Sequence, residues 1–419
     1  MSKQIVPSVP APAEILSAFR YLLRWIPIAA LVGLMGGTAS AVLLVSLEWA
    51  TKTREAHKGI IALLPLAGLF VGCLYQYWGT TVAAGNNLIL DEIHAEADTQ
   101  QAIPFRMTPL ILLGTFLTHL FGGSAGREGT AIQTGASLAD QLTRPFHLDL
   151  HSRRVLLMAG ISAGFGSVFG TPLAGAVFGI EVLTLGTISY EALAPCLLAA
   201  FVGDLTTRAW GVKHTLYQVT EIPHLSVTAL VYAAVAGAVF GLVALMFARL
   251  MHAVSAAFKS AIAWPPLRPF AGGIIVAGAV FAIGTTKYIG LGIPTTLAAF
   301  SSRLPPYDWA LKLMFTVVTL GSGFKGGEVT PLFFIGATLG NALSHLLPLP
   351  PSLLAGMGFV AVFAGASNTP LASSLMAMEL FGAEAGTYAA IACVFSYLFS
   401  GQTGIYHSQR VVTTKYSGA

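Results

Sequence analysis

Charged side chains are scarce in this sequence, and their scarcity excludes most classes of protein of this length. Asp, Glu, Lys and Arg together make up 10% of the 419 residues, whereas a soluble domain carries about a quarter. Hydrophobic residues make up 55%, and the mean hydropathy is +0.74. A chain of this length folded in water could not bury so much apolar surface. We therefore expect a multi-pass protein whose surface is covered by the lipid bilayer.

Cysteine is also rare, which excludes a disulfide framework. Cys73, Cys196 and Cys393 are odd in number, far apart and set in apolar sequence, so they fit neither disulfide pairing nor zinc-ligand spacing. We expect them to be small buried thiols. The net charge of +4 suits loops that flank a membrane and does not indicate nucleic acid. We expect no cofactor and no bound metal.

Few of the apolar runs are long and uninterrupted. A membrane-spanning helix needs about 20 apolar residues. Ile26–Ala50 meets that length, but many later runs are shorter and are interrupted by some of the 45 glycines. Short, broken helices are tolerated in a membrane only where protein or water covers their backbone. We predict an all-α, polytopic membrane protein with many short, broken and tilted helices.

Two stretches of the chain repeat each other about 200 positions apart. Gly126–Thr130 (GREGT) matches Gly326–Thr330 (GGEVT), and the tetrapeptide TPLA at Thr171–Ala174 recurs at Thr369–Ala372. Order and spacing agree, which predicts two structurally related halves, inverted as in many transporters. Such halves usually place a transport site at their junction.

The repeat also divides the chain. We assign residues 1–208 to a first half with an N-terminal segment, 226–406 to a second half-repeat and 407–419 to a short C-terminal tail. A polar link, Thr206–Ser226, separates the halves. The sequence after Ser400 is too short for an appended soluble regulatory domain, so we expect none.

Three Thr-Pro pairs, at Thr171, Thr330 and Thr369, predict helix starts. Threonine can cap the free amides of a helix, and proline fits the first helical position. The free amides and the helix dipole favour an anion at such a start. Each pair could also simply begin a helix. Several starts near acidic residues in a duplicated membrane chain favour an anion pathway.

Four glutamates lie in apolar sequence, where a carboxylate costs several kcal/mol unless it is functional or paired. For Glu128 we favour a function over a structural ion pair with Arg127, because neighbours on a helix do not face each other. For Glu328 we also favour a function, although Lys325 offers a partner. Glu181 and Glu379 occupy equivalent positions in the two halves. We interpret both as structural or ion-paired.

Together these features resemble the CLC family of chloride channels and proton-coupled anion antiporters. Gly126–Thr130 resembles the family's gating-glutamate motif, and Thr330-Pro331 stands where the second-half anion motif lies. Tyr406, in Gly404-Ile405-Tyr406-His407, resembles the central anion-coordinating tyrosine. Gly290–Pro294 (GLGIP) echoes another family signature. The resemblance runs from about Ile26 to Tyr406.

Three departures from the chloride members are informative. The segment that carries a serine in a GSGIP motif in chloride members reads Gly85-Asn86-Asn87 here. Val182 follows Glu181 where many chloride antiporters carry a second glutamate as internal proton acceptor, and Glu328 has no counterpart in chloride members. These departures resemble the fluoride/proton antiporter branch of the family, and they require a different proton route.

The resemblance implies a function and a site. The chain would be a proton-coupled fluoride exporter of a bacterial-type inner (plasma) membrane, and a homodimer with a pathway in each subunit. Glu128 would be the gating and proton-carrying glutamate, and Glu328 would support coupling. The anion-binding residues would be Asn86, Gly126, Arg127, Val329, Thr330 and Tyr406. The Asn86 amide reaches farther than a serine hydroxyl and can donate to fluoride, although Asn-Asn is also turn chemistry.

Other functions remain open. A chloride/proton antiporter or a passive anion channel of the same fold is the main alternative. An intramembrane serine hydrolase is a remote one, because Ser124 and Ser162 each lie in a Gly-x-Ser-x-Gly motif and His119 is near the first. That motif needs a strand–turn–helix context, whereas we expect helices. Asp91–His94 (DEIH) lacks the spacing of a zinc helix, and we interpret it as an exposed helix face.

Overall fold

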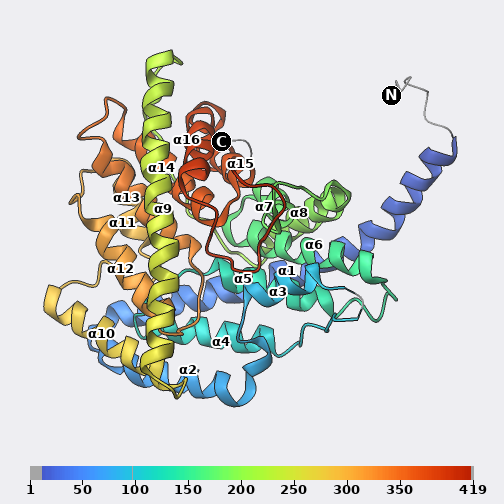
Figure 1. Cartoon of the computed structure of the whole chain (residues 1–419), viewed down its shortest axis with the longest axis horizontal. Coiled ribbons are helices and arrows are strands. Elements are labelled where there is room, and N and C mark those ends of the chain that lie inside the picture. Colours follow the sequence, from blue (N-terminus) through green and yellow to red (C-terminus); the bar gives the residue numbers. More distant parts are fainter. Residues whose placement is uncertain (1–11, 97, 417–419) are drawn as a thin grey trace.

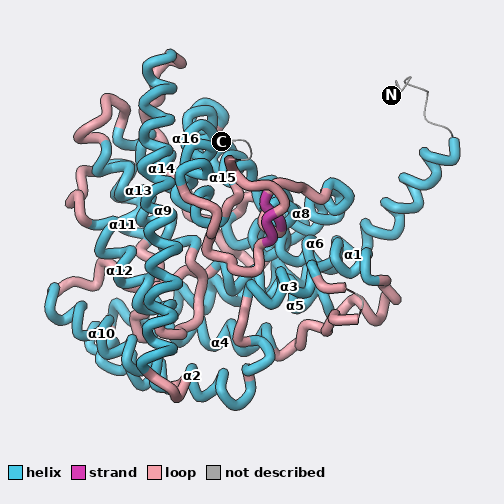
Figure 2. The backbone as a smooth tube through the Cα atoms, in the orientation of Figure 1, coloured by secondary structure: helices cyan, strands magenta, loops and turns pink. Residues whose placement is uncertain are grey.

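A computed structural model describes residues 12–96 and 98–416. The predicted first half and tail therefore include end residues, 1–11 and 417–419, that lie outside the described part. The described chain is almost entirely helical (Figure 2). Its first-half helices are α1 (Pro12–Ala56), α2 (Leu64–Trp78), α3 (Asn86–His94), α4 (Met107–Leu120), α5 (Glu128–Asp140), α6 (Leu150–Phe169), α7 (Pro172–Glu181) and α8 (Leu193–Ala209).

The second group of helices follows an irregular link at residues 210–226. It comprises α9 (Val227–Ala261), α10 (Leu267–Ile283), α11 (Ile293–Ser301), α12 (Asp308–Gly321), α13 (Val329–Leu343), α14 (Pro351–Ser367), α15 (Pro370–Phe381) and α16 (Ala383–Phe399). Two short strands, β1 (Thr184–Leu185) and β2 (Arg410–Val411), pair in parallel. They join the C-terminal tail to the first half, which the sequence did not predict.

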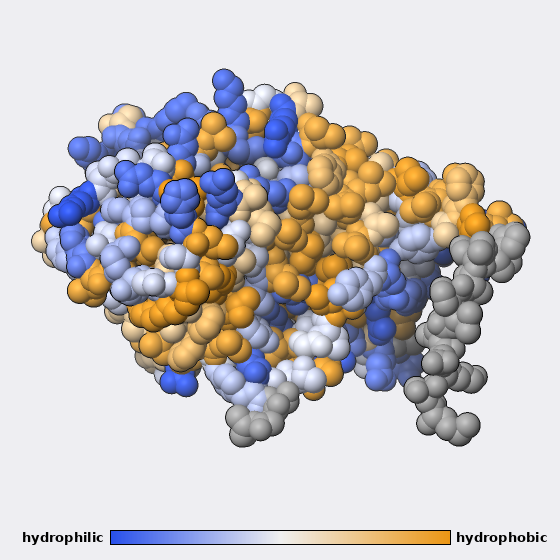
Figure 3. All heavy atoms as spheres, turned by 90° about the horizontal axis from the view of Figure 1, so that it is seen from above, coloured by the Kyte–Doolittle hydropathy of each residue, from blue (hydrophilic) through white to orange (hydrophobic). Residues whose placement is uncertain are grey.

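The prediction of a membrane protein with short and broken helices is confirmed. Four segments of the described chain are long and apolar enough to cross a bilayer, and α1, which contains Ile26–Ala50, and α9 are the longest. In Figure 1, α9 runs the full height of the molecule, while most other helices are far shorter. Apolar side chains cover broad areas of the surface in Figure 3, as expected for a lipid-facing exterior. Cys196 and Cys393 are buried thiols, and Cys73 is half-buried.

The two halves exchange contacts in matching pairs. At the end of α7, the Glu181 carboxylate accepts hydrogen bonds from Leu371 N (2.9 Å) and Ala372 N (2.8 Å) at the start of α15. In return, Glu379 of α15 accepts from the amides of residues 173 and 174 at the start of α7, at 2.9 and 2.8 Å. Each carboxylate therefore caps the other half's helix. Both are structural, as predicted, but their partners are amides instead of cations.

The Thr-Pro prediction is right about two helix starts and wrong about the caps. Pro172 and Pro370 occupy the first position of α7 and α15, but neither preceding threonine side chain forms a cap hydrogen bond. The glutamates of the opposite half supply the acceptors instead. At the third pair, α13 begins at Val329, two residues before Pro331, so Thr330 is not a cap.

Glycines let α5 and α13 pack very closely against their neighbouring helices. A Cβ at Gly336 of α13 would lie 1.9 Å from the carbonyl oxygen of Gly358 in α14. The first half repeats this arrangement, since a Cβ at Gly135 of α5 would lie 2.2 Å from the carbonyl oxygen of Gly160 in α6. Backbone-to-backbone contact of this kind holds α5 against α6 and α13 against α14.

Removal of the reciprocal caps should destabilise the fold unequally. Glu181→Gln turns one of two acceptor oxygens into a donor and leaves a buried amide without a partner, which costs about 1–3 kcal/mol. Glu379→Gln should cost less because Glu379 is only half-buried, whereas Glu181 is buried. Thermal unfolding in detergent should rank wild type above the Glu379 variant and that above the Glu181 variant. Equal midpoints for all three would contradict the capping role.

A methyl group at the α13–α14 contact should also destabilise the protein. Gly336→Ala forces two backbones apart, and overpacking of this kind costs about 1–3 kcal/mol or more. Gly278→Ala in α10 is the matched control, because nothing lies within 4 Å of a Cβ there. We expect a lower unfolding midpoint only for Gly336→Ala. A similar midpoint for both variants would show that the close approach is dispensable.

Candidate functional site

The starts of α5 and α13 meet at the junction of the two halves. Gly126 N donates to Gly327 O (2.6 Å), and Gly327 N donates to Gly126 O (2.9 Å). A Cβ at Gly126 would lie 2.6 Å from the Glu128 Oε2 atom and 2.9 Å from Gly327 O, so only glycine fits there. The two repeated motifs thus form one site instead of two.

Glu128 fills the start of α13. Its Oε2 atom accepts from Thr330 N at 3.0 Å and from Arg127 N at 3.1 Å, and its Oε1 atom accepts from the Thr330 hydroxyl. The side chain is completely buried. Free amides at a helix start are the donors that bind anions, so this carboxylate occupies a ready-made anion position.

Arg127 contributes little direct pairing to Glu128. Its Nε atom lies 3.9 Å from Glu128 Oε1, which is too far for a hydrogen bond. That nitrogen is buried and has no hydrogen-bond partner among the described residues. Backbone amides and Thr330, rather than a neighbouring cation, therefore hold the carboxylate.

Glu328 stands at the N-cap position of α13 but its side chain does not cap the helix. Its Oε2 atom is buried and has no hydrogen-bond partner in the described structure. The sequence offered Lys325 as an ion-pair partner, but the Lys325 ammonium lies over the Tyr75 ring, 4.0 Å from its centroid. Val329, which the resemblance assigns to anion binding, is the next residue and is fully buried. A second carboxylate thus lies beside Glu128 without a cation.

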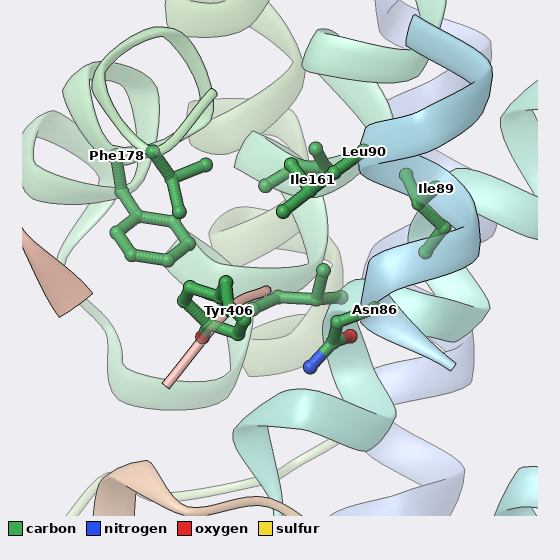
Figure 4. A pocket seen from close by; sticks show the side chains of 8 residues that line it. Asn86, Ile89, Leu90, Ile161, Phe178 and Tyr406 are labelled. Carbon is green, nitrogen blue, oxygen red and sulfur yellow. The ribbon is translucent and has the colours of Figure 1, made fainter. Parts of the chain in front are cut away.

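A small chamber adjoins the site on another side. Its volume is about 10 Å³, close to the least that holds one water molecule. Figure 4 shows Asn86 and Tyr406 side by side at one end of it, with Phe178, Ile161 and Leu90 around the rest. Asn86 Oδ1 and the Tyr406 hydroxyl are buried and without partners among the described residues. Two residues with unpartnered polar atoms therefore line an otherwise apolar chamber.

Asn86, in the chamber wall, packs close to the first turn of α5. A Cβ on Gly129, the residue after Glu128, would lie 3.2 Å from Asn86 Nδ2. Asn86 is the first residue of α3 and follows Gly85, whose φ of 61° suits glycine. Val182, at the position where the resemblance implies a second glutamate in many chloride antiporters, lines the same chamber. Asn86, which the resemblance assigns to anion binding, thus lines the chamber and begins a helix instead of lying in a turn.

A wide cavity of about 850 Å³ reaches the site from elsewhere and is lined by Arg127. Its charged lining comprises Lys52, Arg54, Arg127, Lys213 and Lys287 against Glu48 and Glu55. This excess of cations attracts anions. The predictions from sequence missed the cavity, because its residues come from α1, the link and the loop before α11. The GLGIP segment, through Gly292 and Pro294, supplies part of its wall.

The alternative sites predicted from sequence do not form. Both ring nitrogens of His119 lie by carbonyl oxygens, of Thr115 (2.9 Å) and Ala125 (3.0 Å), and the Ser124 hydroxyl pairs with Thr316. Ser162 lies within α6, so neither serine has the strand–turn–helix context of a hydrolase.

The interpretation of Asp91–His94 as an exposed face is wrong in part. Glu92 is buried and its Oε2 atom lies 3.3 Å from Arg153 Nη1, while the same arginine binds Asp140 at 2.6 Å. A buried cation 61 positions away explains the error, since a carboxylate in a short polar stretch normally indicates solvent.

Comparisons with known proteins agree on one family. The family model for voltage gated chloride channels matches residues 67–401. A chloride/fluoride channel protein of Pseudomonas syringae pv. tomato is 56% identical over 409 residues, which cover 96% of this chain and 90% of that protein. An H(+)/Cl(-) exchange transporter, ClcA, of Vibrio vulnificus is 25% identical and covers 84% of this chain and 81% of its own length.

Solved structures give the same result. The crystal structure of a CLC-type fluoride/proton antiporter matches with a TM-score of 0.88 and 33% identity, over 96% of this chain and all of that one. A slow cyanobacterial Cl-/H+ antiporter matches with a TM-score of 0.76 and 20% identity, over 91% and 94%. At 20% identity, the likeness to the cyanobacterial antiporter shows the fold alone. The predicted resemblance is confirmed, and this membrane protein belongs to the CLC family of anion channels and transporters.

Proposed function

We propose that this protein exports fluoride from the cytoplasm in exchange for protons across a bacterial-type inner membrane, as a homodimer. The observation that carries the proposal is the Glu128 carboxylate at the start of α13, held by Thr330 N, Arg127 N and the Thr330 hydroxyl. A small anion would use the same donors. The carboxylate and the anion therefore compete for one position.

Protonation of Glu128 would release that position. A neutral carboxyl group binds amides at a helix start more weakly than a carboxylate does, because the helix dipole favours negative charge. The freed donors would then bind fluoride that enters along the cationic wall of the wide cavity. Glu128 would carry its proton away from the anion, and each exchange would require both ions.

Glu328 would support this exchange. Its unpartnered Oε2 atom can accept a hydrogen bond from protonated Glu128, which a deprotonated Glu128 cannot donate. It would thus hold the displaced side chain in its neutral state. Since Val182 cannot accept a proton, the proton route would depend on Glu128 itself.

The choice of fluoride rests on the donors and on the relatives. Fluoride is smaller and more strongly hydrated than chloride, so a site that selects it must replace water with close donors. Thr330, Asn86 and the Tyr406 hydroxyl would supply them. The 56% identical relative is named for chloride and fluoride, and the 33% identical structure is that of a fluoride/proton antiporter. Export of one fluoride against one entering proton moves two charges, worth about 4.6 kcal/mol at about 100 mV.

The decisive experiment uses the purified protein in liposomes. A fluoride gradient should drive protons uphill, and an equal chloride gradient should drive far fewer. Fluoride is followed with a selective electrode and protons with an external pH electrode. Equal driving by chloride would favour a chloride antiporter of the same fold, and anion flux without proton movement would favour a passive channel.

Glu128→Gln should abolish fluoride-driven proton uptake, because glutamine cannot carry a proton in this pH range. The amide also loses one acceptor at the start of α13. Glu55→Gln is the matched control, since Glu55 is exposed and lines the wide cavity without contacting Glu128. Proton uptake at the wild-type rate in the Glu128 variant would remove this residue from the proton pathway.

Glu328→Gln should weaken coupling without abolishing transport. Its amide remains polar and nearly isosteric, so the site should keep its shape. We expect more fluoride ions to pass for each proton, as measured from simultaneous fluoride and proton fluxes. If the exchange ratio equals that of the wild type, Glu328 has no part in coupling.

A further inference from the structure

Tyr406 lies in a segment without regular structure, so something other than a helix must hold it. The segment follows α16 and leads into the C-terminal tail, and β2 begins four residues later. The Tyr406 side chain is buried, and its hydroxyl has no hydrogen-bond partner in the described part of the chain. The hydroxyl itself therefore cannot fix the ring in the small chamber. Packing of the ring in the hydrophobic core and the backbone on either side must therefore hold it.

One glutamine binds that backbone to both halves of the molecule. Gln409 Nε2 donates to Val182 O (3.0 Å) and to Ser367 O (3.2 Å), and Gln409 Oε1 accepts from Asn368 Nδ2 (2.8 Å). Val182 is the C-cap of α7, and Ser367 is the last residue of α14. Three hydrogen bonds thus join a side chain three residues after Tyr406 to one helix end from each half.

The same glutamine connects to the chamber through its partners. Val182 lines the chamber that Tyr406 and Asn86 share. Next to Gln409, Ser408 N donates to Asn87 Oδ1 at 3.1 Å, and Asn87 directly follows Asn86. Loss of the Gln409 bonds would loosen the ties of the segment to the ends of α7 and α14, and the Tyr406 hydroxyl would move with it.

We propose that Gln409 is a positioning residue that holds the Tyr406 hydroxyl at the distance from Asn86 that suits fluoride. A site for a small anion must be held to within about 0.5 Å of its working geometry by supporting contacts. A looser chamber accommodates the larger chloride at less cost. Gln409 therefore sets the preference between the two anions without touching either, an inference that rests on the proposed function of the site.

Gln409→Met tests this role because methionine is similar in size and lacks the amide. Gln141→Met is the matched control. Gln141 is also half-buried, and its Nε2 atom donates to two carbonyl oxygens, of Ile103 (3.1 Å) and Ser137 (2.9 Å), but at the far end of α5. Initial rates of fluoride and chloride efflux from liposomes give an anion ratio for each variant.

The fluoride-to-chloride ratio should fall about tenfold in Gln409→Met, as loss of an outer-shell partner commonly causes, and should stay unchanged in Gln141→Met. Thermal midpoints should fall equally in both. In a Tyr406→Phe background, Gln409→Met should change the ratio no further, because coupled residues are not additive. A ratio in Gln409→Met equal to that in Gln141→Met would overturn the proposal, as would a full additional change in the Tyr406→Phe background.

A second variant covers the case in which Gln409→Met does not fold. Asn87→Leu removes the acceptor for Ser408 N, which is another tie of the same segment, and should lower the ratio in the same direction. An unchanged ratio there would contradict the proposal. A wild type that prefers chloride would refute the fluoride function alone, since a shifted ratio in Gln409→Met would still support the positioning role. A wild type that moves neither anion would refute both.

Discussion

The hydrogen bonds between a carboxylate of one half and the free amides of a helix in the other half organise this molecule. The arrangement occurs with Glu128 at the start of α13, Glu181 at α15 and Glu379 at α7. Each carboxylate satisfies amides that have no partner within their own helix. The duplicated halves are thus joined through charge placed against helix dipoles, in an interior where few cations are available.

The three carboxylates differ in what surrounds them. Glu181 binds two successive amides, one with each oxygen, and so does Glu379. Glu128 binds Thr330 and its own neighbour Arg127 instead, and Arg127 lines a cavity of about 850 Å³. Water and ions can therefore reach Arg127, the residue next to Glu128. The hydrogen bonds between a carboxylate and helix amides therefore join the two halves at Glu181 and Glu379. At Glu128 the same kind of bond supports the proposed exchange.

The sequence was informative where the evidence was local. The glycine-flanked glutamates at 128 and 328, the starts of α7 and α15, and the duplication could all be read from short motifs, because close backbone approach and helix starts have a residue signature. Partners from distant positions could not be predicted. The amides bound to Glu181 lie about 190 positions away, and the cation beside Glu92 lies 61 positions away, and no local pattern encodes either. The prediction that Thr330 caps its own helix was wrong for the same reason, because its hydroxyl donates to Glu128 in the other half.

The absence of a second carboxylate at Val182 constrains the proposed mechanism further. With a glutamate there, a proton could leave the anion path through the chamber independently of the anion. The chamber is instead lined mainly by apolar side chains, and Asn86 and Tyr406 are the polar residues among the described ones that line it. Neither is a proton acceptor near neutral pH. A proton on Glu128 would then have to travel with that side chain through the position that fluoride would occupy in the proposed exchange. Because one position cannot hold both, the anion and the proton would alternate, and alternation at a single position is sufficient to couple them.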